Sequence, residues 1–96
     1  MADTITADTT PTTAEECFEL GMIHASGRDG AVDLVTAHKW FNIAASRGHS
    51  DAARLRREVA AQMADAEIGM AQRAARDWLK ANPLVAEPAP PLRVAA

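Results

Sequence analysis

The chain has no tyrosine, one cysteine and few aromatic residues: its 96 residues include two Trp and two Phe. This scarcity argues against a β-sandwich, because strands are rich in aromatic and β-branched side chains. Cys17 has no second cysteine to pair with, so a disulfide framework is excluded. The longest apolar runs fall far short of the ~20 residues that a membrane-spanning helix needs.

Alanine supplies nearly half of the apolar residues. Hydrophobic residues make up 48% of the chain, but 22 of them are Ala, which leaves 24 larger apolar side chains. A chain of this length forms one small domain, and so few large side chains can fill only a thin core. Closely packed helices suit such a core, so we predict an all-α fold of four antiparallel helices.

The charge of the chain is acidic overall and unevenly distributed. The net charge is −3, which argues against a nucleic-acid binder, since these usually carry a basic stripe. Residues 1–33 carry a net −6 and residues 34–96 a net +3. Charges matched to helix dipoles would explain this asymmetry. Attraction between the two halves, within one fold or between neighbouring copies, is the alternative.

The first residues give no sign of a targeting segment. Met1–Ile5 is not a basic stretch followed by an apolar run, as a secretory signal would be. A lone thiol also fits a reducing compartment. We therefore predict a cytoplasmic protein with no membrane partner.

Composition divides the chain into three parts. Residues 1–12 hold five Thr and Pro11, which predicts a flexible N-terminal arm. Residues 83–96 hold four of the five prolines and are predicted to form a Pro/Ala-rich, extended tail. The predicted helical domain spans 13–82.

Local signals place the first two helices. Thr13 and Glu16 form a capping box for a helix that ends near Ser26, where Gly27 is a natural terminator. Asp33 caps a second helix over 34–47. Its apolar stripe recurs at helical spacing at Ala37, Trp40, Phe41, Ala44 and Ala45.

The remaining helices are less sharply separated. Ser50 is a good cap for a third helix that reaches Met63, and Asp65 can cap a fourth that ends at Ala81. One long helix is the alternative, because Gly69 would cost only ~1 kcal/mol in a helix interior. Compactness favours a turn over 63–67, since a single long helix would leave Ile68 and Trp78 with nothing to bury them.

The spacing of these residues resembles one unit of the Sel-one-like repeat, a relative of the tetratricopeptide repeat. The resemblance covers about 16–52, followed by degenerate cap helices over about 50–81, and His24 stands where the family commonly has Tyr. The matching positions are Leu20, Gly21, Gly27, Asp33, Ala37, Trp40, Phe41, Ala44, Ala45, Gly48 and Ala52. The resemblance implies a helix-turn-helix solenoid fragment and a non-enzymatic adaptor or scaffold that binds another protein.

A single repeat unit cannot bury its own apolar face. The outer face of the first helix is therefore the candidate partner surface, formed by Glu15, Phe18, Glu19, Met22 and Ile23. The alternative is a structural homo-oligomer, in which exposed solenoid faces stack on one another. A third hypothesis is a pH response at His24, should it lie buried beside a carboxylate.

The sequence shows no catalytic or metal-binding pattern. The three histidines, His24, His38 and His49, lack the spacing of metal ligands. Cys17 lies near Glu16 and Glu19, whose charges would raise the pKa of its thiol and make it a poor nucleophile. We therefore predict no enzyme activity, no catalytic residue, no metal, no cofactor and no small-molecule substrate.

Overall fold

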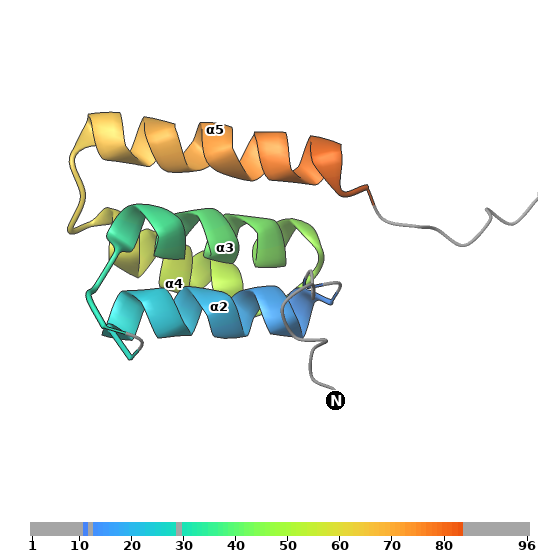
Figure 1. The fold of residues 1–96 in the computed structure, drawn as a ribbon, viewed down its shortest axis with the longest axis horizontal. Helices are drawn as coiled ribbons and strands as arrows, with labels where there is room; N and C mark the ends of the chain where they lie inside the picture. Colours follow the sequence, from blue (N-terminus) through green and yellow to red (C-terminus); the bar gives the residue numbers. More distant parts are fainter. Residues whose placement is uncertain (1–10, 12, 29, 84–96) are drawn as a thin grey trace, which may run out of the picture.

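The structure is a computed structural model, and it describes residues 11, 13–28 and 30–83. Its elements are α2 (Ala14–Ser26), α3 (Leu34–Ser46), α4 (Ala52–Ala60) and α5 (Asp65–Ala81), with no strand in the described ranges (Figure 1). The all-α, four-helix prediction is confirmed. The predicted arm and tail lie outside the described residues, apart from Pro11 and Pro83.

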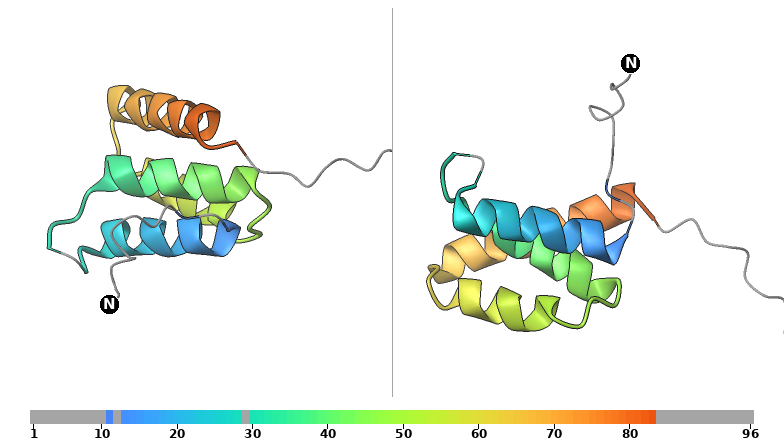
Figure 2. Two further views of the ribbon diagram at one scale, coloured as in Figure 1. Left: turned by 45° about the vertical axis from the view of Figure 1, so that its right-hand side comes forward. Right: turned by 90° about the horizontal axis from the view of Figure 1, so that it is seen from below.

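Helix α3 is the centre of the fold, because α2, α4 and α5 all pack on it. Successive helices run in opposite directions (Figure 1). Helices α2 and α5 lie on opposite sides of α3, and α4 lies behind α2 and α3 (Figures 1 and 2). Each of the two flanking helices therefore has a side that no other helix covers.

The first two helices begin and end as predicted. The Thr13 hydroxyl accepts from the Glu16 amide at 3.0 Å, and the Glu16 carboxylate accepts from the Thr13 amide at 3.1 Å. Gly27 then ends α2 with a left-handed φ of 75°. At the start of α3, Asp33 Oδ1 accepts from the Thr36 amide at 3.0 Å. This backbone hydrogen bond is the main reason that the pKa of Asp33 lies below its usual value.

The caps predicted for the last two helices are wrong. Helix α4 begins at Ala52, not at Ser50, and no side chain caps it. Gly48 has a positive φ of 98°, and the turn that follows it includes Ser50 and Asp51, so the helix starts only after them. Asp65 is the first residue of α5 and not its cap; the Glu67 carboxylate accepts from the Ala64 amide at 2.9 Å instead.

Helices α4 and α5 are separate, so the predicted break between them is confirmed, but the turn lies at 61–64 and not at 63–67. Helix α4 ends at Ala60, which is earlier than predicted, and Met63 lies in the turn before α5. Trp78 is thereby brought back onto α3, where its ring meets that of Trp40 edge-on with centroids 5.3 Å apart.

The core lies between α3 and the three helices around it. Phe41, Ile43 and Cys17 are its largest fully buried side chains. Phe41 lies against Gly21 of α2: a Cβ built on this glycine would be 2.5 Å from Phe41 Cε1. The absence of a side chain at Gly21 therefore lets α2 and α3 approach closely over the Phe41 ring.

Candidate interaction surface

The uncovered side of α2 carries acidic side chains. Cys17 and Gly21 are buried against α3. Residues spaced by four lie on one side of a helix, so Glu15, Glu19 and Ile23 lie together on the side facing away from α3. Both carboxylates are exposed and Ile23 is half-buried.

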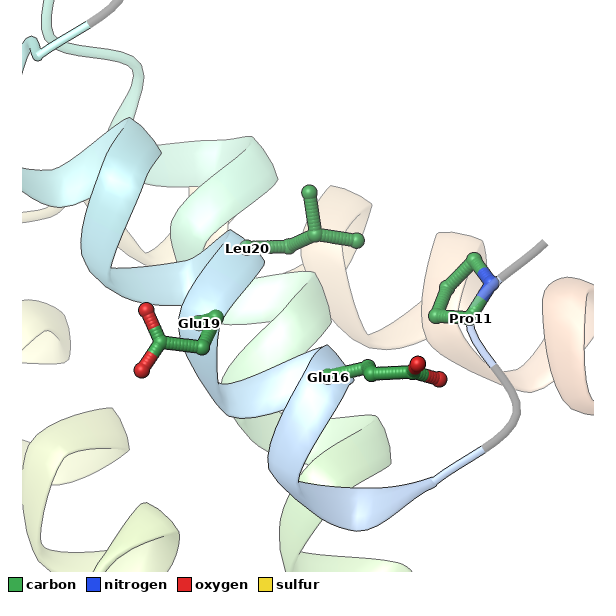
Figure 3. A pocket seen from close by; sticks show the side chains of 4 residues that line it. All are labelled: Pro11, Glu16, Glu19 and Leu20. Carbon is green, nitrogen blue, oxygen red and sulfur yellow. The ribbon is translucent and has the colours of Figure 1, made fainter. Parts of the chain in front are cut away.

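A shallow hollow of about 270 Å³ lies beside this acidic side. It is lined by Pro11, Glu16, Glu19 and Leu20 (Figure 3). The Glu16 side chain extends toward Pro11, while Leu20 also packs against the core cluster that contains Trp40. The Glu19 carboxylate points to the opposite side of α2 from that of Glu16, at the edge of the hollow (Figure 3). An exposed carboxylate at the edge of an apolar hollow suits a long cationic side chain, whose apolar stem and charged head need different surroundings.

Two members of the predicted partner surface are partly buried and pack against the core. The Phe18 ring stacks on the His49 ring with centroids 4.0 Å apart and lies 5.6 Å from the Phe41 ring. Met22 packs against the cluster that contains Phe41 and Val59. The free surface of α2 is therefore narrower than predicted, because α4 and the turn before it cover one flank of the helix.

Glu15, the first acidic residue of that surface, contacts the same turn. Its Oε1 lies 3.1 Å from His49 Nε2. The Glu15 side chain is nevertheless 67% exposed, whereas that of His49 is 12% exposed. Glu15 thus remains accessible from solvent while it helps to hold His49 against Phe18.

The residues that carry the family resemblance lie mainly in the core or at turns. Gly27 and Gly48 have positive φ values of 75° and 98°, and Ala45 is half-buried against the cluster of Trp40. Most of the rest are buried, namely Gly21, Ala37, Trp40, Phe41, Ala44 and Ala52. These positions shape the helix packing and leave little for a ligand to contact.

Arg47 links the end of α3 to the end of α5. Its Nη2 donates to the Asn82 carbonyl at 2.7 Å, and its guanidinium lies 5.1 Å from the centre of the Trp78 ring. These contacts stabilise α5 against α3 through a cation–π interaction and a charged hydrogen bond. Trp78 therefore closes the core at this end.

The structure gives Cys17 no features of a nucleophile. The thiol is fully buried, and burial raises its pKa more than the nearby Arg47 charge lowers it. Glu16 adds a smaller increase. A raised pKa means less thiolate at neutral pH, so Cys17 has the environment of a packing residue.

The described residues show neither a metal-binding cluster nor a membrane-spanning helix. No group of three or more His, Cys, Asp or Glu side chains among them is placed to hold a metal ion. In the same part of the chain, no helix has the length and apolarity to cross a membrane.

His38 of α3 is buried close to Arg56 of α4, and the sequence predicted no role for it. Its side chain has 2% of its surface exposed, and Nδ1 has no hydrogen-bond partner among the described residues. Burial lowers the pKa of His38, and the charge of Arg56 on α4 lowers it further. Arg56 is held there by a 3.2 Å hydrogen bond to Asn42.

We expect this histidine to make the fold sensitive to mild acid. A group with a lowered folded pKa binds more protons when unfolded, so its contribution is complete above the unfolded value of 6.5 and is lost as pH falls below it. The free energy of unfolding in urea should decrease from pH 7.5 to 5.5, by at most about 1.4 kcal/mol per pH unit.

His38→Met should reduce this pH dependence, while the matched control His24→Gln should retain it. An unchanged slope in His38→Met would assign the acid sensitivity to another group.

Comparisons with known proteins found no match to any family model, curated protein or solved structure. The resemblance to the Sel-one-like repeat therefore rests on the motif residues and stays a prediction.

Proposed function

We propose that the chain is a non-enzymatic protein–protein interaction module, a small adaptor or scaffold of the Sel-one-like repeat type. The observation that carries this proposal is the hollow on the uncovered side of α2, where Leu20 and Pro11 lie beside Glu16 and Glu19. A binding surface commonly combines apolar contact area with a few polar groups that orient the partner. The lone, buried thiol favours a reducing compartment such as the bacterial cytoplasm.

The chemistry of the hollow indicates the kind of partner. Glu19 has no ion-pair or hydrogen-bond partner among the described residues, so it is available to a cation. The adjacent Leu20 offers apolar contact. We infer a protein segment that carries Arg or Lys next to Leu or Met, presented on a helix that can lie along α2.

Binding of short amphipathic helices tests this function. The probes are synthetic basic helices that carry Leu and Met, together with acidic versions of the same peptides, followed by amide chemical shifts of the isotope-labelled chain. We expect shifts over residues 16–23 with the basic peptides, and weaker shifts with the acidic ones. Glu19→Arg should reduce affinity about tenfold by replacing attraction with repulsion.

Glu58→Arg is the matched control, because it makes the same charge change at an exposed position of α4. It should bind like the unmodified chain. Shifts confined to another surface, or equal loss of affinity in both variants, would contradict the proposed site.

A further inference from the structure

The uncovered side of α5 is the second free helix face of the fold. The opposite side of this helix packs on α3 through Ala71 and Ala75. Helical spacing places a different set of residues outward: Ala66, Gly69, Met70, Arg73, Asp77 and Lys80. We call this set the α5 outer face. Its side of α5 meets no other helix in Figure 1.

Two features of the α5 outer face suit a second helix. Met70 is 51% exposed, which makes it one of the two large hydrophobic residues most exposed among the described residues. Gly69 lies beside it in the helix interior, where glycine costs about 1 kcal/mol relative to alanine. Apart from the backbone of α5, a Cβ built there would meet no atom closer than Arg73 Nη1 at 3.6 Å. Packing within the chain therefore does not require a glycine, whereas a neighbouring helix could approach closely over it.

The α5 outer face carries more basic than acidic side chains. The side of α2 that faces away from α3, formed by Glu15, Glu19 and Ile23, is acidic, and we call it the free side of α2. Arg73 and Lys80 have no acidic partner among the described residues, and neither has the adjacent Arg76. Asp77 is the single acid among them. Helix α2, by contrast, carries three carboxylates and neither Lys nor Arg. Pairing α5 with α5, or α2 with α2, would bring like charges together, whereas pairing α5 with α2 brings opposite charges together.

We propose that the α5 outer face binds the free side of α2 in a second copy of this chain, which stacks the molecules head to tail. The inference rests on the proposed function and names the partner of the same α2 surface. The two faces lie on opposite sides of the molecule (Figure 1), so one copy can use both at once. A contact between two different surfaces extends as a stack unless a rotation closes it into a ring.

The helix directions give this contact a definite register. Helices α2 and α5 run in opposite directions within one molecule (Figure 1), and stacking copies in the same orientation keeps them antiparallel across the contact. Suppose that Ile23 of one copy lies opposite Met70 of the other. Glu19 then lies about 6 Å from Ile23 toward the start of α2, and Arg73 lies about 4.5 Å from Met70 toward the end of α5, which is the same direction in an antiparallel pair. Arg73 is thus placed beside Glu19, and Lys80 lies toward the acidic start of α2.

Charge reversal tests this pairing in the full chain. Sedimentation velocity over increasing concentration, up to the millimolar range, should show reversible association that weakens as salt is added. Glu19→Arg and Arg73→Glu should each weaken the association about tenfold, because each turns an attractive pair into a repulsive one. The double variant that carries both changes restores opposite charges and should associate like the unmodified chain.

Arg57→Glu is the matched control for Arg73→Glu, because it makes the same charge change at an exposed position of α4, and it should leave association unchanged. A strictly monomeric chain at all concentrations overturns the proposal, and so does a double variant that stays dissociated. A monomer that still binds basic helices at Glu19 would refute stacking alone and leave the proposed function standing. Stacking without any binding of foreign helices would instead refute the proposed function and leave the stacking proposal standing.

Discussion

Replacing Phe41 with alanine should remove about 3–5 kcal/mol of folding free energy, as truncation of a buried aromatic side chain does. Phe41 is fully buried and packs with Ala37 and Val59. Its ring also contacts Phe18 of α2, so three helices lose contacts in this one change. The total stability of a domain of this size is only about 4–10 kcal/mol. The variant should therefore lose a large part of its stability and unfold at a clearly lower urea concentration.

Urea unfolding followed by circular dichroism measures this loss. Met70→Ala is the control, since it also truncates a large apolar side chain but at an exposed position, and its effect should stay within about 0.5 kcal/mol. A loss below about 1 kcal/mol for Phe41→Ala would mean that Phe41 is not the centre of the packing.

The local signals of the first two helices were read correctly, whereas the caps expected at Ser50 and Asp65 were wrong. The Thr13 capping box, the left-handed Gly27 and the Asp33 cap each depend on a few neighbouring residues, and the structure shows all three. The cap expected at Ser50 failed because neighbouring residues offer competing starts for the helix. Ser50 and Asp51 are both acceptable caps by residue type, and only the path of the turn after Gly48 decides where α4 can begin.

The candidate surface was only partly predictable from the sequence, because α2 has apolar residues on several sides. Phe18, Met22 and Ile23 look equivalent by composition, but only the first two pack against the core cluster that Phe41 forms with Val59 of α4. The hollow has no local signal either, since Pro11 approaches α2 from outside the helix. The burial of His38 likewise has no local signal in the sequence. The acidic character of α2, in contrast, is visible in the sequence, and so is the grouping of Arg73, Arg76 and Lys80 in the second half of α5.

The two glycines in helix interiors should respond to alanine with opposite signs. Helix propensity alone predicts that each substitution adds up to about 1 kcal/mol of stability. Gly69→Ala should do so, because the space around it is open. Gly21→Ala should instead destabilise the fold by about 1–3 kcal/mol, as overpacking of a core does. Its Cβ would be 2.5 Å from Phe41 Cε1, and the buried ring has Phe18 beside it and little room to move.

A double-mutant cycle assigns this loss to the contact with Phe41. In a Phe41→Leu background the aromatic ring atoms that Gly21 accommodates are absent, so Gly21→Ala should cost less than in the unmodified chain. We expect a coupling of at least about 0.5 kcal/mol, the usual size for residues in direct contact. Urea unfolding of the four proteins measures it. Additive effects, or stabilisation by Gly21→Ala alone, would mean that α2 and α3 do not depend on a glycine at this crossing. A coupling of the expected sign would show that one missing side chain sets how closely the two helices pack.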